Sequence, residues 1–121
     1  MECSIEKLVF NMFVDILGTR YEIIEGDAET YPKLNECDGY CDNTVYKCVI
    51  NIEYEQDLMN KENLQVFINK IKRHEIIHAF LFESGLAEAT EDDWARNEEM
   101  VDWFANQFPK ILKAFQQANC M

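Results

Sequence analysis

The chain has 121 residues, 48% of them hydrophobic, which is enough for one domain around a single core. Its formal net charge of −12 argues against nucleic acid or an anionic membrane as the main partner, and suits a soluble protein or a basic partner. The first residues lack the positive region of a signal peptide and no segment approaches the length of a membrane span, so the expected location is the cytoplasm.

The front half of the chain is predicted to form the sheet. Residues 1–13 have helically spaced apolar side chains and are expected to be a helical or irregular N-terminal extension of the single domain 1–121. Residues 14–17 and 20–25 then form a hairpin around Gly18, and residues 27–38 a loop. Residues 39–41 and 45–52 form a second hairpin, in which Tyr46, Cys48, Ile50 and Ile52 share one side of the strand.

Five cysteines, an odd number, are typical of free thiols in a reducing compartment. Cys37, Cys41 and Cys48 have the spacing C-x3-C-x6-C, but no fourth cysteine or spare histidine lies nearby to close a second zinc site. Cys41 and Cys48 are alternatively expected to face each other across the second hairpin.

Two helices are predicted in the second half. Residues 62–83 contain no glycine or proline and repeat apolar side chains with a helical period, ending before a left-handed Gly85. Ile76, Ile77 and Phe80 make its second half apolar nearly all round, as in a buried helix. Residues 91–117 form the second helix, in which Pro109 introduces a kink or starts a separate final helix. The expected fold class is α+β, a small antiparallel or mixed sheet of three to four strands packed on these helices.

The first helix carries the sequence His74-Glu75-Ile76-Ile77-His78, an HExxH motif. Two imidazoles four residues apart lie on one helical face and can bind one metal ion, while the glutamate between them can take a proton from a metal-bound water. Two histidines would fall into this register by chance roughly once in several hundred sequences, so the surrounding sequence must support the match.

Glu98 is the predicted third ligand. It falls on the apolar stripe of the second helix, where an unpaired carboxylate would cost roughly several kcal/mol unless it binds a metal, pairs or is neutralised. Glu99 lies off this stripe. Asp102, one turn later, can accept a hydrogen bond from the far nitrogen of a ligand histidine. Alternatively, Glu98 is a partly exposed residue paired with Arg96 or with a lysine.

With these residues the chain resembles the gluzincins, whose HExxH motif is followed by N-E-x-x-S-D, here Asn97-Glu98-x-x-x-Asp102 with Val101 in place of serine. The resemblance implies zinc bound by His74, His78 and Glu98, with Glu75 as general base. Over residues 14–112 the chain is also similar to small phage and prophage proteins of Gram-positive bacteria that are usually described as metallopeptidases, and more distantly to ImmA/IrrE-type peptidases. In gluzincins an edge strand lines the cleft, and residues 45–52 are its expected equivalent.

Thermolysin-type enzymes also use a further histidine to stabilise the oxyanion, and this chain has none to spare. A tyrosine hydroxyl or Arg20 would have to replace it, with Tyr40 and Tyr46 as the main tyrosine candidates. The remaining tyrosines considered for this role are Tyr21, Tyr31 and Tyr54.

The sequence therefore predicts a zinc-dependent metallopeptidase with one Zn²⁺ per chain and a peptide or protein substrate, phage- or prophage-encoded and active in the bacterial host cytoplasm. The alternative is a non-catalytic interaction module, stabilised by zinc, that binds a host or phage protein.

Overall fold

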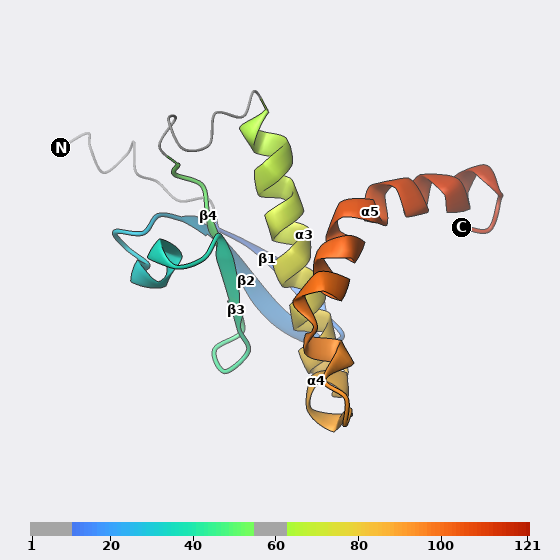
Figure 1. The fold of residues 1–121 in the computed structure, drawn as a ribbon, viewed down its shortest axis with the longest axis horizontal. Helices are drawn as coiled ribbons and strands as arrows, with labels where there is room; N and C mark the ends of the chain where they lie inside the picture. Colours follow the sequence, from blue (N-terminus) through green and yellow to red (C-terminus); the bar gives the residue numbers. More distant parts are fainter. Residues whose placement is uncertain (1–10, 55–62) are drawn as a thin grey trace.

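A four-stranded mixed sheet forms one layer of the fold; one long helix lies against it, and the second long helix packs on the first (Figure 1). The computed structural model describes residues 11–54 and 63–121. In this part of the chain the fold is α+β, as the sequence predicted. Its elements are β1 (Asn11–Ile16), β2 (Thr19–Gly26), the 3₁₀ turn η1 (Pro32–Asn35), β3 (Gly39–Asp42), β4 (Lys47–Asn51), α3 (Leu64–Glu83), α4 (Leu86–Ala89), the 3₁₀ turn η2 (Trp94–Arg96) and α5 (Glu98–Gln117).

Both predicted hairpins are present. β1 pairs antiparallel with β2 through a two-residue turn at Leu17 and Gly18, whose φ angles of 51° and 93° suit the twist of a tight hairpin. β3 pairs antiparallel with β4. The expected extension differs from the structure at residues 11–13, which belong to β1; residues 1–10 lie outside the described chain.

The strand expected to be the cleft edge is in fact internal. The sheet order is β1-β2-β4-β3, because β4 also pairs in parallel with β2. Cys48, Val49 and Ile50 are all buried, so β4 is covered on both faces, as an interior strand must be. The prediction that residues 45–52 form the edge was therefore wrong, and β3 occupies that position.

The two faces of the sheet pack against different parts of the chain. On the α3 face, Ile23, Cys48 and Ile50 contact Ile68, Ile71 and Ala79, with Ile52 also against this cluster. On the opposite face, Ile24 and Val49 pack with Leu34 of η1. Cys48, Ile50 and Ile52 therefore share a side as predicted, whereas Tyr46 precedes β4 and is exposed.

Helix α3 matches its prediction closely at both ends. It starts after Asn63, whose side chain accepts a hydrogen bond from the Val66 backbone N–H, and it ends before Gly85 with φ 85°. Phe80 is 41% exposed, so the second half of α3 is not buried all round as the apolar composition suggested.

The second long helix starts later than predicted. Asp93 has a left-handed φ of 55° and Asn97 is extended, so residues 91–97 leave the helix and α5 begins at Glu98. The Asn97 side chain accepts a hydrogen bond from Met100 N–H at 2.7 Å and caps the helix. Trp94 is consequently exposed rather than part of the buried stripe, which consists of Val101 and Ala105.

Helix α5 continues through Pro109 as one element. Proline has no N–H for the carbonyl four residues earlier, that of Ala105. Arg73 on α3 supplies the missing donor, because its Nε lies 2.6 Å from the Ala105 carbonyl oxygen. This bond ties α5 to α3, after which the C-terminal half of α5 projects away from the sheet (Figure 1). None of the helices in the described residues has the length and apolar character needed to cross a membrane.

Candidate metal centre

The two histidines of the chain lie together on one face of α3. Their ring centroids are 4.9 Å apart, and their side chains are only 13% and 12% exposed. The four-residue spacing predicted this geometry, because residues one helical turn apart stack along the same face.

Glu98 completes a group of three potential metal ligands. Its Oε1 lies 2.8 Å from His74 Nε2 and 3.2 Å from His78 Nε2, and the three ligand atoms fall within 4.8 Å of one another. Ligand atoms around a tetrahedral zinc are about 3.3 Å apart, given metal–ligand bonds of about 2.0–2.1 Å. Two imidazole nitrogens and one carboxylate oxygen therefore suit zinc in both spacing and chemistry.

Local structure at the start of α5 positions this carboxylate. Glu98 is the first residue of the helix, where the unpaired backbone N–H groups favour a negative charge. Its side chain is 74% exposed, so the carboxylate is held against the histidines rather than buried among core residues. Arg96 makes no ion pair with it in the described chain, which disfavours the alternative of simple surface pairing. Glu99 does not belong to the three-residue group, in agreement with its predicted position off the stripe.

Asp102 lies behind His74, as expected. Its Oδ1 is 3.2 Å from His74 Nδ1 and 3.1 Å from Lys70 Nζ. Burial acts to raise the pKa of Asp102, but the hydrogen bond and charge of Lys70, together with those of His74, bring it below its ordinary value. An ionised Asp102 can accept a hydrogen bond from His74 Nδ1–H, and in this tautomer the Nε2 lone pair is free to bind a metal ion.

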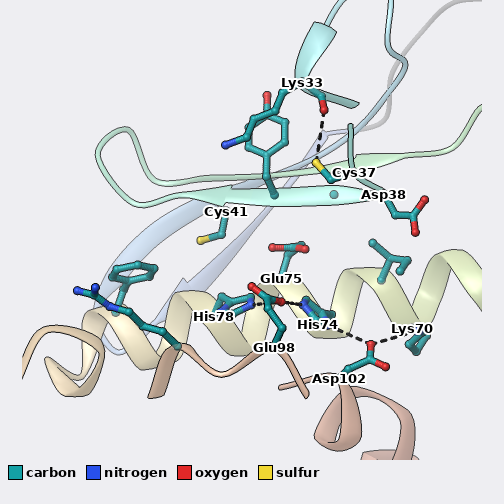
Figure 2. Close-up of a pocket in the computed structure, with 15 residues that line it drawn as sticks. Lys33, Cys37, Asp38, Cys41, Lys70, His74, Glu75, His78, Glu98 and Asp102 are labelled. Carbon is teal, nitrogen blue, oxygen red and sulfur yellow. Dashed lines mark hydrogen bonds and ion pairs between the residues drawn. The ribbon is translucent and has the colours of Figure 1, made fainter. Parts of the chain in front are cut away.

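The two histidines and Glu98 line a cleft between α3, α5 and β3. Glu75 also lines it but is buried, 6% exposed, and lies below β3 (Figure 2). Burial, opposed by the charge of His74 and assisted by that of Glu98, raises the pKa of Glu75 to about 7. Gly39 leaves room for it, because a Cβ at that position would lie 3.3 Å from the Glu75 Cγ and 3.0 Å from the Val49 carbonyl oxygen. A carboxylate with this pKa is suited to exchanging protons near neutral pH.

The three predicted oxyanion candidates do not converge on the histidines. Arg20 and Tyr46 line a separate hollow, where the Arg20 guanidinium lies 3.9 Å from the Phe13 ring. Tyr40 borders the metal cleft, but its ring packs on the sheet face opposite α3. Side chains alternate between the faces of a strand, so Cys41 faces α3 and Tyr40 does not.

The other tyrosines of the described chain have different roles or positions. The Tyr21 hydroxyl donates to Glu83 at 2.8 Å, and burial is the main cause that raises its pKa. The Tyr54 hydroxyl donates to Asp38 at 3.1 Å. Tyr31 packs beside Leu34 on the face away from α3.

The cleft, about 550 Å³ in volume, also contains residues that the motifs did not identify. Lys33 is in η1 and Arg96 is in η2, two 3₁₀ turns without a periodic pattern that sequence reasoning could use. The remaining unpredicted lining residues are Cys37, Asp38, Gly39, Cys41, Lys70, Ile71 and Phe82.

Cys41 and Cys48 face each other in the β3–β4 register, as one of the two sequence alternatives proposed. The Cys48 thiol donates to the Glu75 carbonyl oxygen at 3.6 Å. Within the described residues, the three cysteines Cys37, Cys41 and Cys48 do not form a metal-binding group.

Comparisons of the chain with protein-family models, curated proteins and solved structures found no match. The resemblance to gluzincins therefore stays a prediction from the two motifs.

Proposed function

We propose that the protein is a zinc-dependent metallopeptidase of gluzincin type, in which Glu75 is the general base. The observation that carries this proposal is the convergence of His74 and His78 from α3 with Glu98 from α5. Residues 20 and 24 positions apart in sequence supply three ligand atoms of the types found in catalytic zinc sites.

Each neighbouring residue has a role in this mechanism. Bound zinc would polarise the scissile carbonyl and lower the pKa of a water molecule. Glu75 would take a proton from that water and deliver it to the leaving amine, a role that suits a buried carboxylate beside the ligands. Asp102 holds His74 in the tautomer that can bind metal.

The donor set favours catalysis over the alternative of a zinc-stabilised interaction module. Zinc sites that serve folding normally have four protein ligands, while catalytic sites have three and keep one position for water. Among the described residues the group consists of three side chains, with a buried carboxylate beside it.

The sheet edge offers a place for an extended substrate. β3 is an edge strand, and its residues Gly39, Tyr40 and Cys41 border the cleft above Glu75. A peptide that adds to this edge by backbone hydrogen bonds would lie between β3 and the metal ligands.

The experiment that tests the proposal compares the zinc-loaded wild type with Glu75→Gln on a mixed peptide library, with cleavage followed by mass spectrometry. We expect cleavage by the wild type, at least ~100-fold slower cleavage by the variant, and equal zinc content in both, because Glu75 is not a ligand. Equal activity in the two proteins, or none in a wild type that contains zinc, would contradict the proposal.

A further inference from the structure

We infer that Lys33 and Arg96, which border the cleft on opposite sides of β3, are carboxylate-binding residues, so that the site selects peptides with a carboxylate beside the bond to be cut. This inference rests on the proposed function for its reaction, but the recognition itself can be measured without cleavage. The carboxylate can be an acidic side chain or the C-terminus of the peptide.

The charged groups of the cleft differ in whether they have partners. The four carboxylates among its described residues all do, or are buried: Glu98 contacts both histidines, Asp102 contacts Lys70 and His74, Asp38 accepts from Tyr54, and Glu75 is buried. The cations that line the same cleft are Lys33, Lys70 and Arg96.

Of these cations, only Lys70 is neutralised by a carboxylate in the described part of the chain. Lys33 contacts the Tyr40 ring, with its Nζ 5.0 Å from the centroid, and its ammonium has no carboxylate partner among residues 11–54 and 63–121. The guanidinium of Arg96 has no carboxylate or side-chain hydrogen-bond partner among residues 11–54 and 63–121. A guanidinium without such a partner is well suited to bind the carboxylate of a peptide through two parallel hydrogen bonds.

Lys33 and Arg96 border the cleft from different elements. Lys33 belongs to η1 on the sheet side and lies above β3 in Figure 2, with Glu98 below β3. Arg96 ends η2 and stands two residues before Glu98, on the helix side. A peptide along the β3 edge would therefore pass between one cation on each wall.

The charge of the cleft differs from that of the whole protein. The net charge of −12 favours basic partners for the surface as a whole. The described residues that line the cleft include three cations and four carboxylates, a formal charge of −1 if all are ionised, and bound zinc would change it to +1. Lys33 and Arg96 would therefore lie in a cleft that is much less negative than the protein as a whole.

The test measures binding to zinc-loaded Glu75→Gln by fluorescence anisotropy, since this variant should bind peptides without cutting them. The probes are labelled alanine-rich octapeptides that have an amidated C-terminus and one central residue, Glu, Gln or Lys. A fourth probe has the central Gln and a free C-terminal carboxylate, which separates the two sources of the charge.

We expect the Glu probe or the free-carboxylate probe to bind roughly tenfold more tightly than the amidated Gln probe. Introducing Lys33→Ala or Arg96→Ala into the Glu75→Gln protein should weaken this preference, and both replacements together should remove it. Lys110→Ala is the matched control, because it deletes one exposed positive charge of α5 outside the cleft and should leave the preference intact.

Equal binding of the amidated Glu and Gln probes and the free-carboxylate probe would overturn the inference, as would tightest binding of the Lys probe. It is also overturned if none of the probes binds, or if the preference survives in the double variant. If Glu75→Gln shows this preference but the zinc-loaded wild type cleaves no peptide, the hydrolytic function is refuted and the inferred carboxylate recognition stands.

Discussion

Replacing Glu98, and separately its neighbour Glu99, by alanine tests the metal centre most selectively. Both residues lie in the first turn of α5 and both are exposed, so each substitution removes one carboxylate from the same helix terminus. They differ in one respect: Glu98 Oε1 contacts both histidines, whereas Glu99 is outside the ligand group.

The expected loss of zinc affinity in Glu98→Ala follows from the number of ligands at the site. Zinc sites with four protein ligands bind with about 10–16 kcal/mol, so one ligand accounts for roughly 3 kcal/mol, or ~100-fold in affinity. Glu98→Ala should therefore weaken zinc binding at least ~100-fold. At a fixed excess of zinc, this costs about 2.7 kcal/mol of stability and lowers the melting temperature by roughly 10 °C.

Zinc affinity can be measured by competition with a chromophoric chelator, and melting by circular dichroism with zinc or with EDTA. In EDTA the two variants should melt together, because the Glu98 side chain is 74% exposed and packs little. With zinc, Glu99→Ala should remain within about 0.5 kcal/mol of the wild type. Equal losses of affinity in both variants, or a larger loss in Glu99→Ala, would refute the ligand assignment.

Three further predictions concern the residues around the ligands. Gly39→Ala should lower peptidase activity at least tenfold with zinc content unchanged, because the new Cβ lies 3.0 Å from an Ile71 methyl and 3.3 Å from the Glu75 Cγ; parallel activity and metal assays check this. Asp102→Asn should weaken zinc binding roughly 10–100-fold in a chelator competition, because His74 loses its ionised partner. Metal-free protein should lose stability as the pH rises from about 4.5 to 7, since the folded pKa of Glu75 is raised and the folded state holds its proton longer than the unfolded state. Urea unfolding in EDTA should show Glu75→Gln gaining up to roughly 3 kcal/mol relative to wild type between pH 5 and pH 8, whereas a constant difference would contradict this.

The arrangement of the ligands could be predicted from the sequence because it depends on spacing within single helices. The four-residue spacing of His74 and His78 requires only that the segment be helical, and an uninterrupted apolar period predicts that. The helical phase placed Glu98, and not Glu99, beside the histidines, as the structure does, even though the start of its helix was predicted seven residues too early. The phase from Glu98 to Val101 and Ala105 lies entirely within α5, so the error at residues 91–97 did not affect it.

The features that the sequence did not reveal depend on contacts between distant segments. Because β4 pairs in parallel with β2, the edge strand beside the cleft is β3 and not β4. The pattern of side chains within one strand does not specify which other strands it pairs with. Tyr40 was a reasonable oxyanion candidate by residue type, but it faces away from α3 because Cys41 faces toward it. Lys33 and Arg96 reach the cleft from short 3₁₀ turns, where neither periodicity nor a motif marks a functional residue.

The central claim is that zinc is held by two histidines and one carboxylate with an open position. X-ray absorption at the zinc edge of protein reconstituted with one equivalent of zinc measures this directly. We expect one bound ion per chain, with only nitrogen and oxygen neighbours at about 2.0–2.1 Å, from His74, His78, Glu98 and water. A sulfur neighbour at about 2.3 Å, which would come from a thiol such as Cys41 in the cleft, would contradict it, as would a protein that retains no zinc.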